Sequence, residues 1–115
     1  MSIVDTTVHP YQLILVYASS SYSKKELKKD LEKLLLPEMT IIITGDFNFD
    51  KKETNALTNF LGTKRMKQLV KWPTHKEGRT IDHLYVSNDV KVEIIRYSPY
   101  YSDHDALCIK FEDFP

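Results

Sequence analysis

Residues 41–50 read "IIITGDFNFD", and this stretch decides how the rest of the chain is interpreted. The β-branched run Ile41–Thr44, with a proline upstream and Gly45 at its end, favours a short buried strand that stops at the glycine. Asp46 and Asn48 follow two residues apart, so both side chains can point to one side of an extended loop. Such a carboxylate and amide can hold a metal ion or orient a water, but the same residue types also favour turns for purely local reasons.

Composition bounds the answer without choosing a function. A chain of 115 residues with 42% apolar and 28% charged residues suits one ordinary globular domain. Lys plus Arg equal Asp plus Glu at 16 each, so net charge indicates no class of partner. Charge is uneven along the chain, however, since 64–79 holds six basic residues against one acid, Glu77. This run can meet phosphates or can be an ordinary solvated face.

The single cysteine, Cys108, cannot form an intramolecular disulfide, and it lies in an apolar run where packing is its expected role. No apolar segment is long enough to span a bilayer, and the amino terminus lacks the pattern of a signal peptide. We therefore expect no membrane contact and an intracellular location, the nucleus included, rather than secretion.

The pattern predicts an α/β fold. Residues 1–10 carry no periodic signal, and the first strand is expected at Tyr11–Ala18. Ser23 then suits the N-cap of a helix over 24–36, whose leucines form an apolar stripe at helical spacing. Strand, helix and strand in this order predict a crossover between two neighbouring strands of one sheet.

The second part of the chain predicts a further helix and several strands. Asp50 is expected to cap a helix over 52–61 that Gly62 closes. Three strands are expected at 81–86, 90–97 and 106–111, with 87–89 as a hairpin turn between the first two. The whole pattern predicts a layered, mixed β-sheet with helices on one face.

Two further stretches each carry an Asp-His pair beside an apolar run: "IDHLYVS" at 81–87 and "SDHDAL" at 102–107. In this order, "GDFN" and these two motifs resemble the carboxyl-terminal half of the endonuclease/exonuclease/phosphatase family, which has the DNase I-like fold. The strings "WPTHKEGRTIDHLYVS" at 72–87 and "YYSDHDAL" at 100–107 look most like the endonuclease domains of mobile elements, such as Helitrons and non-LTR retrotransposons. The resemblance covers roughly residues 12–111.

The resemblance implies half of a four-layer α/β sandwich, with 1–115 as a single partial domain whose core lies at about 11–111. The family's first half supplies a strand-end Asn and a metal-binding Glu, and nothing upstream of Tyr11 matches either. The sheet would then expose an apolar face. We expect a second copy of the chain, or the missing amino-terminal half-domain, to cover it.

The resemblance also assigns roles to matching residues. Asp46 would orient or deprotonate the attacking water, and Asn48 would position the phosphate beside it. Asp103 would lie at or near the metal. His104 would contact the scissile phosphate, with Asp82 hydrogen-bonded behind it to fix its orientation and favour its charged form.

Three more residues match family positions with weaker support. Tyr17 aligns with a strand-end tyrosine whose hydroxyl reaches the phosphate, and a core aromatic is the alternative. Thr74 and Arg79 match positions near the nucleic-acid surface, with an ordinary polar loop as the alternative. His83, next to Asp82, should face the opposite side of its strand and have a structural role.

Mg²⁺ or Mn²⁺ suits these residues better than zinc, because oxygen ligands predominate and only one cysteine is present. The first functional hypothesis is therefore a metal-dependent phosphodiester hydrolase of the DNA endonuclease type. The second is an inactive half-domain that binds nucleic acid or self-associates. A third is a relative that acts on phosphorylated small molecules or lipids, and the basic run at 64–79 favours nucleic acid over it.

Overall fold

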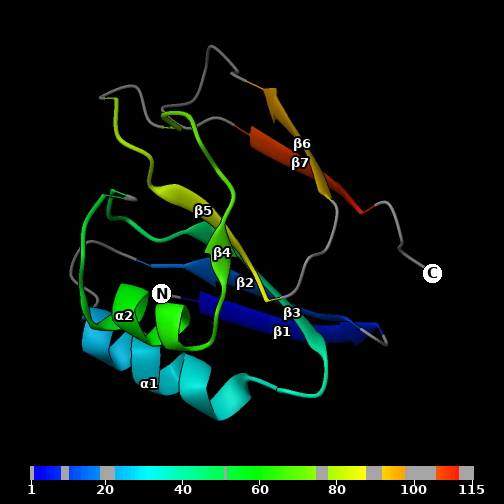
Figure 1. The fold of residues 1–115 in the computed structure, drawn as a ribbon. Helices are drawn as coiled ribbons and strands as arrows, with labels where there is room; N and C mark the ends of the chain where they lie inside the picture. Colours follow the sequence, from blue (N-terminus) through cyan, green and yellow to red (C-terminus); the bar gives the residue numbers. More distant parts are fainter. Residues whose placement is uncertain are drawn as a thin grey trace.

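A computed structural model describes residues 2–8, 11–18, 23–50, 52–74, 78–87, 92–97 and 106–111. For 92–97 and 106–111 the description is of the backbone. Five strands form one sheet in the order β1-β2-β3-β5-β4 (Figure 1). Their bounds are Ser2–Val8 (β1), Tyr11–Tyr17 (β2), Thr40–Asp46 (β3), Lys67–Gln68 (β4) and Asp82–Val86 (β5). The helices are Lys24–Leu34 (α1) and Ala56–Thr63 (α2), and a separate hairpin pairs Val92–Tyr97 (β6) with Ala106–Phe111 (β7).

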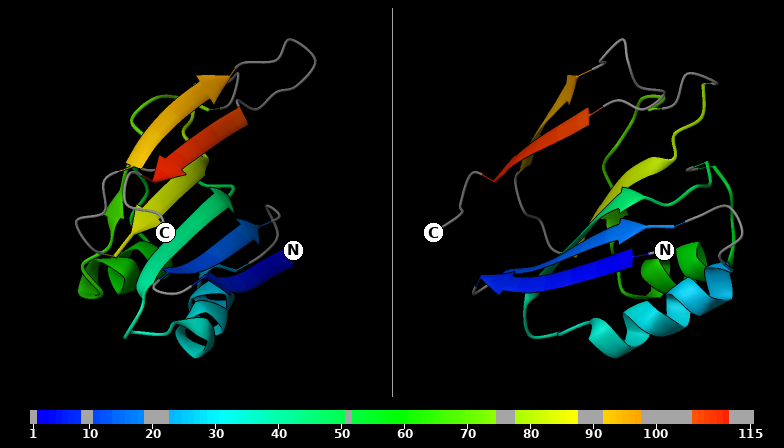
Figure 2. Two further views of the ribbon diagram at one scale, coloured as in Figure 1. Left: turned by 90° about the vertical axis from the view of Figure 1, so that its right-hand side faces the viewer. Right: turned by 180° about the vertical axis from the view of Figure 1, so that it is seen from behind.

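The sheet is mixed, which confirms the predicted fold class. β2 and β3 pair in parallel through the α1 crossover, while β1, β4 and β5 join the sheet by antiparallel pairing. Both helices lie on the same side of the sheet, and the β6–β7 hairpin lies on the other (Figures 1 and 2). None of the helices in the described part of the chain is both long and apolar enough to cross a membrane.

α1 begins as predicted and ends two residues early. The Ser23 hydroxyl accepts a hydrogen bond from the Lys25 N–H at 3.2 Å and caps the first turn. At the other end, the buried Gln12 amide donates to the Leu34 carbonyl at 2.7 Å and accepts from the Leu36 N–H at 2.9 Å. Because Gln12 takes up the Leu36 N–H, the chain leaves the helix before the predicted end at 36.

α2 begins later than predicted and is capped by a different residue. Asn55, not Asp50, is the N-cap, and it forms a reciprocal capping box with Thr58. Gly62 lies inside the helix, and Arg65 at φ 59° supplies the left-handed residue that ends it. The Arg65 N–H bonds to the Gly62 carbonyl and the next N–H bonds back to Leu61, which is a Schellman arrangement without a glycine.

Two other sequence-based expectations were wrong. Residues 2–8 form β1, which pairs with β2 along its whole length, so this segment is not irregular. β1 is an edge strand, and its polar residues obscure the periodic pattern that would predict a strand. β5 and β6 do not pair as the predicted hairpin, since β5 pairs with β3 and β4 while β6 pairs with β7.

Candidate functional site

Three of the predicted site residues lie side by side across the sheet. In the register of the strands, Tyr17 of β2 pairs with Asp46 of β3, and Asp46 pairs with Asp82 of β5. Paired residues of neighbouring strands project on the same face of a sheet, with Cα atoms about 4.5–5.5 Å apart in an antiparallel pair. We call these three residues the Tyr17–Asp46–Asp82 row. The row lies on the face away from the helices, since Val16 and His83 beside it point to the helix side.

Gly45 makes this row possible. β3 continues through Gly45 to Asp46, so the strand does not stop at Thr44 as the sequence suggested. A Cβ atom at Gly45 would lie 1.9 Å from the Val16 carbonyl oxygen, and the residue's φ is 140°. Only glycine lets β2 and β3 approach closely enough here for the Ala18 N–H to donate to the Asp46 carbonyl at 2.8 Å.

The segment after Asp46 is both a local turn and part of the candidate site. The Asn48 N–H donates to Asp46 Oδ1 at 2.9 Å, which is an Asx turn, and Asn48 has a left-handed φ of 55°. Phe47 and Phe49 on either side are buried in the core under the helices. These two buried side chains fix the loop, so Asn48 is held next to Asp46.

Thr74 holds Asp82 in place from behind. Its side chain is 1% exposed, and its hydroxyl oxygen accepts hydrogen bonds from the Ile81 N–H at 3.1 Å and the Asp82 N–H at 3.0 Å. The Thr74 N–H in turn donates to the Arg79 carbonyl at 3.1 Å. Thr74 thus fixes the backbone that delivers Asp82, while Arg79 in the same loop has an exposed side chain. The sequence placed Thr74 near the site but gave no signal for this contact.

His83 is a core residue on the helix side of β5. Its ring is fully buried and stacks on Phe47 with centroids 5.1 Å apart. Nε2 lies 2.7 Å from the Thr80 carbonyl oxygen and Nδ1 lies 2.9 Å from the Tyr85 hydroxyl. The carbonyl can only accept, so Nε2 carries the proton and Nδ1 accepts from Tyr85. Burial lowers the pKa of His83, so the ring is held neutral.

The remaining predicted residues are placed as follows. Tyr17 is 57% exposed, so its side chain is not the core aromatic that was the alternative. Asp103 and His104 lie outside the described residues, and their roles stay predictions.

The oxygen donors of the row's two carboxylates and of the neighbouring Asn48 fit a hard cation. Asp46, Asn48 and Asp82 offer carboxylate and amide oxygens, and Mg²⁺ takes only one or two protein carboxylates while keeping waters and substrate phosphates as further ligands. Within the part of the chain that the structure describes, no group of three or more His, Cys, Asp or Glu side chains is arranged to hold a metal.

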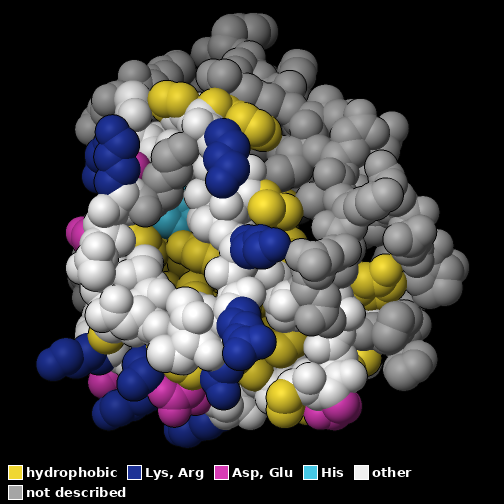
Figure 3. All heavy atoms as spheres, in the orientation of Figure 1, with side chains coloured by type: hydrophobic (Ala, Val, Ile, Leu, Met, Phe, Trp, Pro, Cys, Tyr) yellow, Lys and Arg dark blue, Asp and Glu magenta, His cyan; other side chains and the backbone are white. Residues whose placement is uncertain are grey.

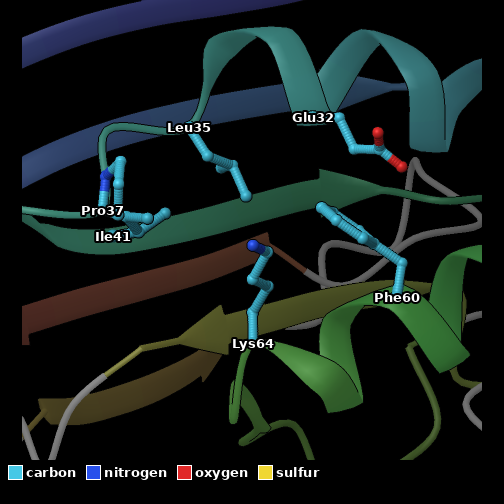
Figure 4. Close-up of a pocket in the computed structure, with 6 residues that line it drawn as sticks. All are labelled: Glu32, Leu35, Pro37, Ile41, Phe60 and Lys64. Atoms are coloured by element: carbon cyan, nitrogen blue, oxygen red, sulfur yellow. The ribbon is translucent and has the colours of Figure 1, made fainter.

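A pocket of about 280 Å³ lies away from the row, between α1, α2 and the start of β3 (Figure 4). Its lining is Glu32, Leu35, Pro37, Ile41, Phe60 and Lys64. Ile41 and Asp46 are five residues apart on β3, so the pocket and the row are separated by about 17 Å of strand. With a single carboxylate and mostly apolar walls, the pocket does not offer the chemistry predicted from the sequence.

Comparison with known proteins shows the fold and the family of the chain. No curated protein matches the chain. Among solved structures, it is similar to that of CdtB, the biologically active subunit of cytolethal distending toxin, with a TM-score of 0.61 at 14% identity. The match covers 93% of this chain and 50% of that chain, so this chain spans half the length of CdtB. At this identity the likeness shows the fold alone, which is half of a DNase I-like fold. Residues 11–108 match the family described as endonuclease-reverse transcriptase, and the chain belongs to that family.

Proposed function

We propose that this protein is a divalent-metal-dependent phosphodiester hydrolase that acts on nucleic acid, of the DNA endonuclease type. The observation that supports this most is the Tyr17–Asp46–Asp82 row. Strand register alone brings these three residues, which match positions of the family, to neighbouring strand ends on one face of the sheet. These residues are far apart in sequence, and packing the core does not require two carboxylates side by side. Family membership supports the same class of chemistry.

Asp46 and Asn48 act on the nucleophile and the phosphate. One oxygen of the Asp46 carboxylate accepts the Asn48 N–H, so the group is held in a fixed orientation. A fixed carboxylate orients the attacking water and removes its proton. The Asn48 amide, held beside it between two buried phenylalanines, positions a phosphate oxygen for in-line attack.

Asp82 and Tyr17 flank Asp46 on either side. Asp82 accepts a hydrogen bond from the ring of His104, fixes its orientation and favours its charged form, and His104 contacts the scissile phosphate. The exposed Tyr17 hydroxyl donates to a phosphate oxygen. Thr74 keeps Asp82 in this position, and the exposed Arg79 contacts the substrate backbone from the same loop.

Asp103 is the residue we assign to Mg²⁺ or Mn²⁺. When bound, the ion stabilises negative charge on the phosphate and the leaving oxygen. The row contributes what the ion does not: a fixed water, a fixed phosphate and a defined direction of attack.

The test is nicking of supercoiled plasmid by the purified protein with Mg²⁺ or Mn²⁺, and with EDTA as a control. Asp46→Asn and Asp82→Asn keep side-chain size and remove the charge, and we expect each, like His104→Ala, to slow nicking about a hundredfold or more. Glu38→Gln is the matched control, because Glu38 is an exposed carboxylate in the turn at the opposite end of β3.

Metal-dependent nicking that only the three site variants abolish would support the proposal. If the folded wild-type protein does not nick, or if all variants nick equally, the enzyme hypothesis is wrong. The protein would then be a half-domain that binds nucleic acid or self-associates, and the exposed Leu15 and Tyr17 side chains on the row's face make that the next hypothesis to test.

A further inference from the structure

The basic residues of this neutral chain are concentrated in one segment. Residues 54–75 contain four Lys or Arg and no Asp or Glu, whereas the other 93 residues carry twelve basic against sixteen acidic side chains. All four basic side chains of the segment, Lys64, Arg65, Lys67 and Lys71, are exposed. A single-sign segment within a neutral protein produces a local positive field that attracts anions.

The fold lays the part of this segment that follows α2 along the outer edge of the sheet, where it runs toward the row. β4 is the edge strand, and Lys67 pairs with Val86 of β5. From there the segment runs antiparallel to β5, with the Leu69 N–H donating to the Leu84 carbonyl at 2.9 Å. It then meets the loop before Asp82, where the Thr80 hydroxyl donates to the Trp72 carbonyl at 2.9 Å.

Lys67 also lies on the same face as the row. Val86, its partner, is four residues from Asp82 on β5, and side chains two and four residues apart on a strand share a face. Four residues of strand span about 13 Å, so Lys67 lies within a few nucleotide steps of Asp82. The edge strand therefore continues the site instead of forming a separate surface.

Lys71 extends the charge toward the loops around the row. With Lys52 it lines a pocket of about 250 Å³ whose other walls are Asp50, Pro73, Gly78 and Thr80. Lys71 donates to the Gln68 carbonyl at 3.1 Å, a contact that steadies the side chain while leaving it exposed. Figure 3 shows Lys and Arg side chains following one another across the face where β4 lies, with most acidic side chains at the lower rim.

We propose that Arg65, Lys67 and Lys71, which we call the β4 strip, hold the sugar-phosphate backbone of a nucleic acid substrate outside the reacting phosphate. The proposal rests on the proposed function and deepens it, because the strip selects a polymeric substrate over a small phosphoester. Lys64 is left out of the strip because its side chain points into the pocket between the helices (Figure 4). Glu32 also lines that pocket, and its Oε1 lies 3.3 Å from Lys28 Nζ, so Glu32 is paired with Lys28.

Lysines on an edge strand have a competing explanation, which is to prevent edge-to-edge pairing between molecules. That role is confined to the strand, and either sign of charge serves it. Arg65 lies before β4 and Lys71 after it, and no acid occurs between 54 and 75. Extension beyond the strand and uniform sign both point to a polyanion.

The experiment measures binding of a fluorescein-labelled 20-base-pair DNA duplex by anisotropy, in EDTA and over a series of salt concentrations. The test variant is Arg65→Asn/Lys67→Gln/Lys71→Gln, where asparagine suits the left-handed backbone of residue 65. The control, Lys25→Gln/Lys29→Gln/Lys33→Gln, removes the same charge from exposed positions of α1. Lys71→Gln alone is the fallback if the triple variant does not fold.

Log K falls as log salt rises, and losing three phosphate contacts should make this negative slope shallower by about 2.7. Binding should also weaken on the order of tenfold or more at low salt. The fallback variant should make the slope shallower by about 0.9. The control should bind like wild type, and hydrolysis of a small diester such as bis(4-nitrophenyl) phosphate should be unchanged in the strip variant.

Equal loss of binding in the strip variant and the α1 control would overturn the proposal, because net charge alone would then explain binding. So would unchanged DNA binding together with aggregation of the strip variant on a sizing column, which would leave edge protection as the explanation. Because binding is measured in EDTA, a protein that fails to nick plasmid still gives a clear result for the strip.

Discussion

The two faces of the five-stranded sheet differ in what covers them. On the helix side, Ile14 and Val16 of β2 are buried under α1 and α2. On the other side of the same strand, Leu15 is 43% exposed and Tyr17 is 57% exposed. Neighbouring residues of one strand thus have opposite surroundings. The second face also holds a smaller buried cluster that includes Ile42, Leu84 and Val86. The Tyr17–Asp46–Asp82 row lies at the end of these strands, where the exposed Tyr17 leaves that face accessible.

The largest effect is expected where both faces depend on one residue. Gly45→Ala would place a Cβ 1.9 Å from the Val16 carbonyl oxygen at a φ of 140°. The Val16 backbone cannot move away without breaking the β2–β3 pairing. We expect a loss of about 4 kcal/mol or more in the free energy of unfolding, or no folded protein at all. Circular dichroism with urea unfolding measures it. The matched variant Gly62→Ala has open space around the new methyl, so it should leave stability unchanged or slightly higher. Equal behaviour of the two variants would show that β2 and β3 are not packed as described.

A leucine from each side sharpens the comparison further. Leu31→Ala removes a fully buried side chain between α1 and the sheet, and we expect a cost of about 2–5 kcal/mol in the free energy of unfolding. Leu15→Ala on the other face should cost less than about 1 kcal/mol, because water already reaches much of that side chain. Urea unfolding at two protein concentrations checks both. If Leu15→Ala costs as much as Leu31→Ala, and its cost grows with protein concentration, a second copy of the chain covers that face.

The sequence predicted elements whose cause is local. The α1 leucine stripe, the Ser23 cap and the parallel β2–β3 crossover follow from periodicity, capping and connection rules, and the structure confirms them. Prediction from the sequence failed where contacts between residues distant in the chain determine the structure. Gln12 ends α1 from the neighbouring strand, and nothing in its own sequence neighbourhood indicates that contact.

The candidate site shows the same division. "GDFN" marked Asp46 and Asn48 because the strand and the turn are local features. That Asp46 and Asp82 are paired in the sheet depends on β5 lying beside β3, which no spacing in the sequence reveals. The positioning role of Thr74 was missed for the same reason, since its hydroxyl binds a backbone seven and eight residues away.

The smallest expected effect is the pH dependence of stability that comes from the buried His83 on the helix side of the sheet. Burial lowers the pKa of His83, so the unfolded chain binds a proton at a pH where the folded protein does not. Stability from this residue is therefore fully present above the ordinary histidine value of 6.5 and is lost as the pH falls below it toward the lowered pKa. One such proton changes the free energy of unfolding by at most about 1.4 kcal/mol per pH unit.

Urea unfolding at pH 7.5, 6.5 and 5.5 measures the slope. The variant His83→Gln, whose amide can still donate to the Thr80 carbonyl, removes this titration. The other histidines remain in both proteins, so the difference in slope isolates His83. A variant less stable at every pH but with the wild-type slope would mean that folding does not shift the pKa of His83, and that the helix side of β5 is not as dry as its packing against Phe47 indicates.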